Sequence, residues 1–373
     1  MTHLVQLILT LSIPMIPQLI QSIKNFRKRN LQLIAEVLVA FDMVRILGTM
    51  VSGGAVRMKH TDGIGVLEYV ELSLPEIEAL EREKTVFLMS VSPIEAHGPH
   101  LPVGTDVFIA SELLNRYVSE LKKNHPELTL VKLPSLYVGS DAVPAPGSLS
   151  VPATHLEGIL TAYGEGLAKQ GFRYLFIADN HGGPRHQMAI EAAARKLWKK
   201  RRFYLIDPFG LVFRYMVQHD PNFMRRTGLG PGECGDSPDS HAGTNETSLM
   251  LACCPEKVRR NYKEVEPSLP PPLRGGAAFV AFLGRLIYSL GGRKLGRDLQ
   301  DPLAYTLAWV SDPDMKPYMG GPAKASKEAG EAMLVARVEV AMELFEKALQ
   351  SGGKEPVHIE PMLWGIRLLR KFP

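Results

Sequence analysis

The sequence contains only three cysteines, and they are poorly placed to pair. Cys253 and Cys254 are adjacent, which leaves Cys234 as the remaining partner for either. Adjacent cysteines rarely bond to each other, so a disulfide framework is excluded as the basis of the fold. Cysteine usage of this kind is typical of a reducing compartment, and we expect a cytoplasmic protein.

Blocks of like charge and long apolar runs are also scarce. The net charge is +4 for 373 residues, and the basic run 195–202 is interpreted as the solvated end of a helix. We therefore expect no nucleic-acid partner. The most apolar stretch, residues 4–20, is interrupted by two prolines and several polar residues and is short for a membrane span. It also lacks the flanks of a signal peptide.

The chain divides into three parts by pattern. Residues 1–60 carry no recognisable motif, and we predict a poorly packed N-terminal extension. The basic residues at 24–29 leave a weak membrane-surface segment as the alternative, although we expect no membrane partner. Residues 67–350 have the regular pattern of a globular domain, and 351–373 form a C-terminal tail. The hydrophobic content of 45% is that of a soluble globular protein.

Strands and helices alternate from residue 67 onward. Strands are predicted over 85–90, 128–133, 173–178 and 203–206. Helices are predicted over 73–84 and 154–171, each opened by a capping box, and over 107–124, 184–201, 246–252 and 323–350. Residues 208–245 look irregular. This alternation predicts an α/β fold with a mainly parallel sheet covered on both faces, a three-layer α/β/α arrangement.

The stretch 91–106 organises the domain. It follows the predicted buried strand 85–90 and contains Glu95, His97 and Asp106, separated by glycines and prolines. Thr105 or Asp106 stands where the N-cap of the next helix belongs. Open α/β sheets build their sites at the carboxyl ends of strands. Two carboxylates and an imidazole converging there suit a divalent cation.

Three further loops hold polar residues suited to a site. Asn180 and His181 follow another predicted strand and precede paired glycines, which let the backbone approach closely. His241 precedes a turn, and Glu246 begins a helix, where a glutamate also serves as a partner of the helix dipole. The third loop is rich in glycine and proline and is predicted to form a pocket wall that contacts substrate through Ser140, Asp141, Gly147 and Ser148.

At these residues the sequence resembles the creatininase (creatinine amidohydrolase) family. The matching motifs are EAHGPHLPVGTD at 95–106, NHGG at 180–183 and HAGTNETS at 241–248, and the resemblance covers roughly residues 67–350. It implies a creatininase-like fold, a homo-oligomer, frequently a hexamer, and two divalent metal ions per subunit, with zinc, manganese or iron(II) as the candidates. It also implies a small-molecule substrate, with Asn180 added to the substrate-binding residues.

Carried over by position, the resemblance assigns Glu95, Asp106 and His181 to one metal. His97 would hold the second metal, with Asp106 bridging. In creatininase proper a glutamate completes the second site at the position of Gly183. We expect Glu246 to replace it. Creatininase also relies on tryptophans around its substrate, yet this chain has none between Trp198 and Trp309, so creatinine as substrate is not implied.

The resemblance implies an amidohydrolase acting on carbon–nitrogen bonds other than peptide bonds, in a cyclic amide, a formamide or a related group, and the residues suit this mechanism. A water shared by two cations loses a proton near neutral pH and can attack an amide carbonyl. His241, assigned with Glu246 to catalysis, can protonate the leaving nitrogen, and His100 orients the loop. Within the family, a deformylase, a peptide-trimming enzyme of cofactor maturation and a hydrolase of cyclic ketones remain open. The alternative outside catalysis is a binding or assembly protein that kept the fold.

Overall fold

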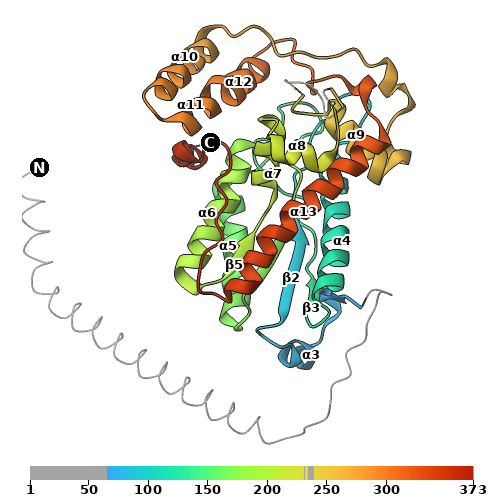
Figure 1. Ribbon diagram of the computed structural model, residues 1–373, viewed down its shortest axis with the longest axis vertical. Coiled ribbons are helices and arrows are strands. Elements are labelled where there is room, and N and C mark those ends of the chain that lie inside the picture. The colour runs from blue at the N-terminus through green and yellow to red at the C-terminus, as the bar shows by residue number, and fades with distance from the viewer. Residues whose placement is uncertain (1–64, 231, 234–238, 373) are drawn as a thin grey trace, which may run out of the picture. The chain divides into compact units, whose positions relative to one another are not determined.

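The structure, a computed structural model, describes residues 65–230, 232–233 and 239–372. The predicted extension 1–60 and Cys234 lie outside the described residues. The core of the described part is one parallel sheet of five strands in the order β1-β3-β2-β4-β5 (Figure 1). Their bounds are β1 Leu67–Glu68, β2 Thr85–Ser90, β3 Thr129–Lys132, β4 Tyr174–Ala178 and β5 Tyr204–Ile206. The predicted parallel sheet is confirmed.

The strand order places a topological switch point between β2 and β4. From β2 the chain moves to β3 on one side, and from β4 it moves to β5 on the other. β2 and β4 pair in parallel from Val86↔Tyr174 to Ser90↔Ala178, so their carboxyl ends meet at the same edge. Loops that leave two neighbouring strands in opposite directions open a crevice there, which is where open α/β sheets bind ligands.

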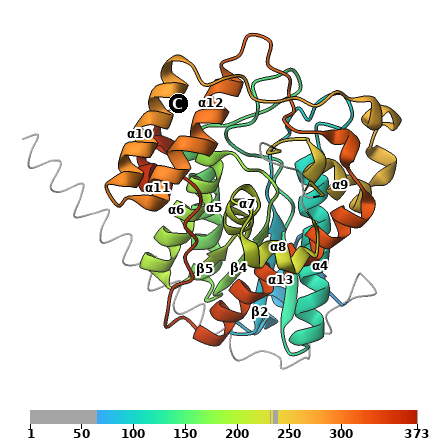
Figure 2. The ribbon, with the colours of Figure 1, turned by 45° about the horizontal axis from the view of Figure 1, so that its top comes forward.

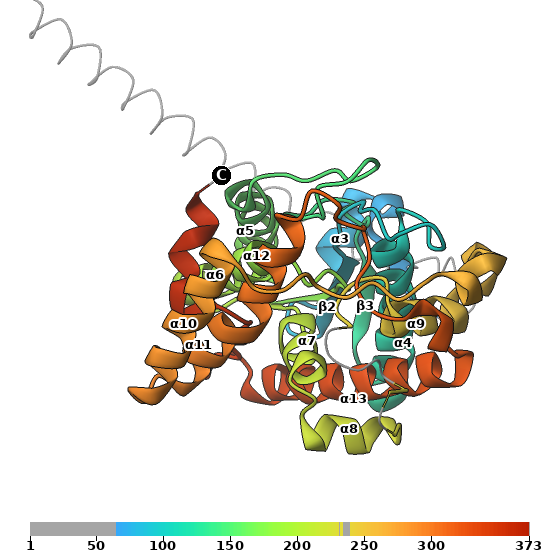
Figure 3. The same ribbon diagram turned by 90° about the horizontal axis from the view of Figure 1, so that it is seen from above.

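Alternate residues of each strand face two separate hydrophobic cores. On one face, side chains such as Leu88 and Phe176 pack against helices α4 (Thr105–Asn124) and α13 (Lys327–Ser351). On the other face, Phe87 and Ile177 belong to a second core with α5 (Ala153–Lys169) and α6 (Pro184–Arg201). Figure 3 shows these helices on the two sides of the sheet. The three-layer α/β/α arrangement is confirmed.

Several predicted helix boundaries are wrong. Helix α3 spans Leu74–Ala79 rather than reaching residue 84. It stops there because Leu80 turns to an extended conformation and is buried, and the Arg82 side chain bonds the carbonyl of Ile77 at 3.1 Å. The second predicted capping box is absent, since α5 already begins at Ala153. The Glu157 carboxylate instead accepts a hydrogen bond from Nε of Arg370 at 2.9 Å.

Residues 208–245 are less irregular than predicted. They contain α7 (Phe209–Val217) and α8 (Pro221–Thr227), which are short and follow each other across a tight turn. Asp220 caps α8 because its side chain accepts hydrogen bonds from the amides of Asn222 and Phe223. Pro221, the first residue of α8, fits a helix start. Helix α9 (Thr244–Cys253) begins two residues before the predicted start. α13 begins at Lys327, four residues after its predicted start, because residues 322–324 form a 3-10 turn instead.

A helical insert separates α9 from α13. It contains α10 (Gly275–Ser289), α11 (Arg293–Asp298), a π-helical turn over Leu299–Leu303 and α12 (Ala304–Val310). Figures 1 and 2 show the insert at one end of the sheet, with α10 at the outer edge of the fold. The segment that leads from the insert back to α13 pairs with the core: the amide of Met319 donates to the carbonyl of His241 at 2.7 Å. Among the described helices, none combines the length and apolar composition needed to span a bilayer.

Candidate metal centre

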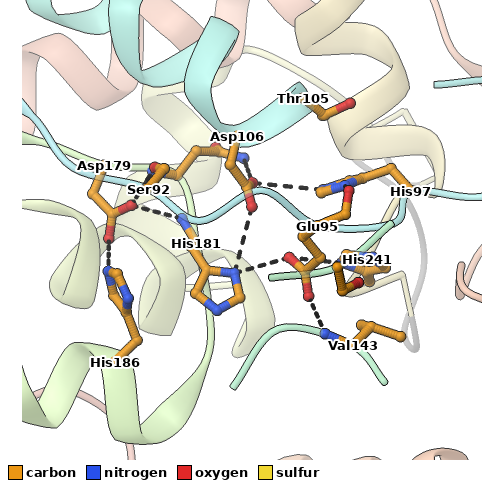
Figure 4. A network of polar contacts seen from close by, with 12 residues as sticks. Ser92, Glu95, His97, Thr105, Asp106, Val143, Asp179, His181, His186 and His241 are labelled. Carbon is orange, nitrogen blue, oxygen red and sulfur yellow. Dashed lines mark hydrogen bonds and ion pairs between the residues drawn. The ribbon is translucent and has the colours of Figure 1, made fainter. Parts of the chain in front are cut away.

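The candidate ligands come together at the switch point. Glu95 and His97 lie in the loop that follows β2, and His181 lies in the loop that follows β4 (Figure 4). Asp106 occupies the first turn of α4, whose N-cap is Gly104 rather than the predicted Thr105 or Asp106. All four side chains are almost completely removed from solvent. Four ionisable groups buried together require mutual neutralisation or a bound cation.

Glu95, Asp106 and His181 form the first group of possible ligands. Nδ1 of His181 lies 2.9 Å from Oε2 of Glu95 and 3.4 Å from Oδ2 of Asp106. The ligand atoms of the three residues lie within 4.8 Å of one another, close enough to hold one metal ion. This set is the one that the sequence assigned to the first metal.

His97, Asp106 and Glu246 form a second group. Nε2 of His97 lies 3.6 Å from Oδ1 of Asp106 and 3.5 Å from Oε2 of Glu246. Glu246 is in the first turn of α9, as predicted. Asp106 therefore faces both groups, one with each carboxylate oxygen. A shared carboxylate offsets the repulsion between two cations a few ångströms apart.

Backbone carbonyls orient the imidazoles of the two groups. Nδ1 of His97 lies 2.9 Å from the carbonyl oxygen of Glu95, and Nε2 of His181 lies 2.8 Å from that of Ser140. When each of these nitrogens donates its hydrogen to the carbonyl, the other ring nitrogen presents a lone pair to the carboxylates. Ligating histidines in metal sites are held in this way.

The donor set fits divalent metal ions. Oε2 of Glu95, Nε2 of His97 and Oδ2 of Asp106 are buried and have no hydrogen-bond partner, although each faces the centre of the group. Burial alone would lower the pKa of His97, but the Asp106 and Glu246 carboxylates raise it to about 10. Burial would likewise lower the pKa of His181, but Glu95 and Asp106 hold this pKa well above its usual value. The surroundings thus favour positive charge at this point, as a proton or as a metal ion.

Asp179 holds the loop that carries His181. Its Oδ1 accepts hydrogen bonds from the Ser92 hydroxyl at 2.6 Å and from the His181 amide at 3.0 Å. Its Oδ2 is bonded by His186 at 3.0 Å and by Gln187 at 2.7 Å. Sequence reasoning missed this role. The position of Asp179 directly after a buried strand was the available signal.

Asn180 connects the two carboxylates that face His97. Its amide nitrogen donates to Oδ1 of Asp106 and to Oε1 of Glu246, both at 2.9 Å. Its oxygen accepts a hydrogen bond from Nη1 of Arg337 at 2.6 Å. The side-chain amide of Asn180, which was predicted to bind substrate, thus has protein partners for both its nitrogen and its oxygen. Arg337 is buried on α13 and belongs to the site. It could not be predicted from the sequence, because it lies within a helix and no motif surrounds it.

Gly183 cannot carry the ligand that creatininase proper has at this position. A Cβ built on Gly183 would lie 2.4 Å from Nε2 of His181 and 2.7 Å from the carbonyl oxygen of Ser140. Any side chain here would displace the hydrogen bond that orients His181. The loop geometry therefore excludes a glutamate at residue 183, and Glu246 approaches the second group from α9 instead.

The predicted pocket-wall loop lies against Glu95. The amide of Val143 donates to Oε1 of Glu95 at 2.6 Å, which leaves Oε2 for the centre. The Ser148 hydroxyl accepts from the amide of Ala96 at 3.0 Å. Asp141, at φ 63°, bonds the backbone and side chain of Arg185. The first two contacts support the loop after β2, whereas the third joins the pocket-wall loop to the start of α6.

The other two loop residues predicted to bind substrate are placed differently. The Ser140 hydroxyl is buried without a hydrogen-bond partner. Gly147, at φ 97°, packs near Val103, because a Cβ there would approach its side chain to 3.0 Å. Ser140 therefore borders the centre, next to the carbonyl that orients His181, whereas Gly147 shapes the turn of the loop.

His241 stands at the open side of the centre. Its Nε2 lies 2.8 Å from the carbonyl oxygen of Ala96, and its Nδ1 faces Glu95 and Glu246 at 4.0 and 3.9 Å. Its side chain is 10% exposed, against 2% for Glu95. The ring of Trp309, from α12 of the insert, lies 5.6 Å from the ring of His241. The insert thus supplies an aromatic wall that sequence reasoning missed.

His100 ties the same loop to α9. Its Nε2 lies 2.9 Å from the hydroxyl of Thr247, and its backbone carbonyl accepts from the amide of Arg259 at 2.9 Å. It takes part in neither of these groups, nor in the third group of possible ligands found in the described residues, which consists of Glu95, His97 and His241. These contacts fit the predicted orienting role.

Comparisons with known proteins agree with this geometry. The curated relatives include two mycofactocin precursor peptide peptidases. The one from Mycolicibacterium smegmatis is 29% identical over 53% of this chain and 72% of its own length. The one from Mycobacterium ulcerans is 28% identical over 61% of this chain and 86% of its own. The similarity to proteins named as peptidases supports a hydrolase.

Solved structures share the fold at low identity. A manganese creatininase structure is 21% identical, covers 76% of this chain and 98% of its own, and gives a TM-score of 0.51. A putative creatinine amidohydrolase from Bacteroides fragilis, also 21% identical, covers 79% of this chain and 98% of its own with a TM-score of 0.52. The family model described as creatininase, creatinine amidohydrolase, matches residues 70–345. On the motifs, the fold and this match, the chain belongs to the creatininase family.

Proposed function

We propose that the protein is a dinuclear metal-dependent hydrolase that cleaves an amide bond. The observation that carries the proposal is the sharing of Asp106 by two groups of buried ligand atoms, one with Glu95 and His181 and one with His97 and Glu246. Zinc, manganese and iron(II) suit this mixture of imidazole and carboxylate ligands. Two bound ions would activate a water and polarise the carbonyl of the substrate.

The protein's own residues divide the remaining work. The carboxylates compensate the charge of the ions, and the bond from Val143 to Glu95 keeps one carboxylate oxygen directed at the centre. When Nε2 of His241 donates to Ala96, a proton at Nδ1 faces the space between Glu95 and Glu246. His241 is therefore placed to donate a proton to a leaving nitrogen that approaches from the open side.

The relatives favour a peptide bond as the target. The proteins named mycofactocin precursor peptide peptidases are more similar in sequence to this chain than the creatininase structures are, at 28–29% against 21% identity. We therefore place peptide amides first and the predicted non-peptide amides second. The fold shared with creatininase supports cyclic amides and formamides as that second class.

The test uses the full chain loaded separately with zinc, manganese and iron(II). Metal content per subunit is measured first, and the loaded protein is then offered blocked peptides, lactams and formamides while released amine is quantified. We expect two ions per subunit and turnover of at least one amide class. Tight binding of two ions with no turnover, and retention of an amide ligand, would instead support the non-catalytic reading. The predicted hexamer and cytoplasmic location are separate proposals, tested by light scattering and by cell fractionation.

A further inference from the structure

Helix α10 presents an apolar face to solvent. Phe279, Phe282, Leu286 and Leu290 recur at spacings of three and four residues, so they lie along one side of the helix. Their exposed fractions are 60, 54, 45 and 78%. We call these four residues the apolar stripe. Large exposed hydrophobic patches of this kind mark interaction sites.

The packing of the insert explains why the large side chains face outward. The buried residues of α10 are Ala277, Ala281 and Gly284. A Cβ on Gly284 would lie 2.6 Å from the backbone nitrogen of Gln300, so the neighbouring chain approaches as closely as a glycine allows. At Gly284, therefore, the inner face of α10 has no room for a larger side chain. The outward position of the stripe is therefore fixed by the hairpin that α10 forms with α11.

The same segment is strongly basic. Between Glu266 and Asp298 the sequence contains five basic residues and no acidic residue, the basic residues being Arg274, Arg285, Arg293, Lys294 and Arg297. All five are exposed. Lys294 pairs with Glu360, whereas Arg285 and Arg293 form no ion pair within the described residues. A surface that combines exposed phenylalanine and leucine with unbalanced positive charge matches the interface of an anionic bilayer.

Contrary to the expectation from sequence of no membrane partner, we propose that the segment 267–297 docks the protein onto an anionic membrane surface, with the apolar stripe buried at the headgroup boundary. The 15 residues of α10 are too few to span a bilayer, so the helix would lie in the plane of the interface. A second copy of the chain packed through the same surface fits less well, because two surfaces with four positive charges each, beside the Lys294–Glu360 pair, would repel. The location of α10 at the outer edge of the fold leaves it accessible to a flat surface (Figure 2).

The test measures binding of the full chain to vesicles of phosphatidylcholine, with and without phosphatidylglycerol. We expect binding to the anionic vesicles that weakens with salt. The double variant Phe282→Asp/Leu286→Asp should bind at least about tenfold more weakly. Arg285→Gln/Arg293→Gln should lose about fivefold per residue on anionic vesicles only, since each basic residue near such a surface contributes about 1 kcal/mol.

Matched variants far from α10 serve as controls. Val70→Asp/Leu74→Asp changes two residues that are 71 and 68% exposed at the opposite end of the sheet, near α3. Lys196→Gln/Lys199→Gln removes two exposed charges from α6. Both should bind like the wild type, and all variants should unfold at unchanged temperature. Absence of wild-type binding, or binding kept by the stripe variant, overturns the proposal. A further outcome would also overturn the proposal. If the wild type does not bind vesicles and the stripe variant has a lower particle mass in light scattering, the stripe serves self-association.

Discussion

The two groups of candidate ligands share Asp106 but differ in how they are built. In the first group, the side chains of Glu95 and His181 are 2 and 4% exposed, and both follow neighbouring strands of the sheet. In the second, Glu246 comes from α9, far along the chain, and its side chain is 13% exposed. The first group is therefore part of the rigid sheet edge, whereas the second faces the opening.

The supporting contacts differ in the same sense. Backbone groups of Val143 and Ser140 hold the first group. The second group also has backbone supports, namely the carbonyl of Glu95 beside His97 and the amide of Ala242 that donates to Glu246 at 2.6 Å. It differs by an added chain of side chains, in which Arg337 holds Asn180 and Asn180 holds Glu246. Side-chain supports are more easily lost than backbone supports in a packed loop. We therefore expect the first group to bind its metal more tightly and the second to exchange its metal more readily.

Removing Asp106, the ligand that both groups share, should abolish the difference in metal affinity between them. Asp106→Ala takes a ligand from both groups and leaves the remaining charges uncompensated, so we expect loss of about one metal per subunit and at least a thousandfold loss of hydrolysis, on the order of 4 kcal/mol of transition-state stabilisation. Metal analysis after dialysis measures the first effect. Asp220→Ala, which removes only the cap of α8, should keep both metals. Two tightly held ions in Asp106→Ala would show that Asp106 does not bridge.

Changing one carboxylate in each group should separate the two. Glu246→Gln keeps the shape but removes the charge and one of the two oxygens that accept from Asn180 and from the amide of Ala242. We expect weaker binding of one metal with the other still held. Glu95→Gln is the mirror variant and should weaken the tighter site. Metal titration with competition by a chelator measures both affinities. If Glu246→Gln binds both ions as the wild type does, Glu246 is a helix-start charge only, worth about 0.3–1 kcal/mol of stability.

The sequence was sufficient for the parts of the site that lie directly after strands. Glu95, His97 and His181 follow buried apolar runs, and the carboxyl ends of parallel strands meet at one edge, so their convergence could be predicted. The same local logic failed for Arg337 and Trp309. Both lie in helices that reach the site only through tertiary packing, and neither has a neighbouring motif.

Helix boundaries failed where a distant contact overrides the local signal. Thr154 and Glu157 have the spacing of a capping box, yet α5 begins at Ala153 and Glu157 pairs with Arg370, more than 200 residues away. The short helices α7 and α8 were missed because prolines at their starts and a polar turn between them resemble an irregular segment. A cap worth about 1 kcal/mol is easily outweighed by packing.

The metal-free protein should lose stability as pH rises. His97 and His181 have pKa values above those of the unfolded chain, so the folded state binds more protons. The stabilisation is complete below pH 6.5, is lost between about pH 6.5 and 10 for His97, and has a slope of up to about 1.4 kcal/mol per pH unit per proton. Thermal unfolding with chelator should show this decline, and saturation with metal should flatten it. A flat profile without metal would contradict the charge balance inferred for the centre.

The smallest change tests whether the second group depends on its side-chain support. Arg337→Met removes the hydrogen bond that fixes Asn180, so the amide can turn away from Asp106 and Glu246. Loss of such outer partners typically costs 10–100-fold in metal affinity, and we expect about tenfold at the second site with the first unchanged. Arg337→Lys should recover part of the loss, since it restores a donor and the charge.

A matched control separates this effect from a general loss of stability. Arg214 is also a buried arginine, but it pairs with Asp298 at 2.9 Å, away from the ligands. Arg214→Met should lower the unfolding temperature and leave both metal affinities as they are. If Arg337→Met instead weakened both sites equally, the support would belong to the whole centre, because Asn180 also contacts Asp106. The side-chain support would then not distinguish the second group from the first.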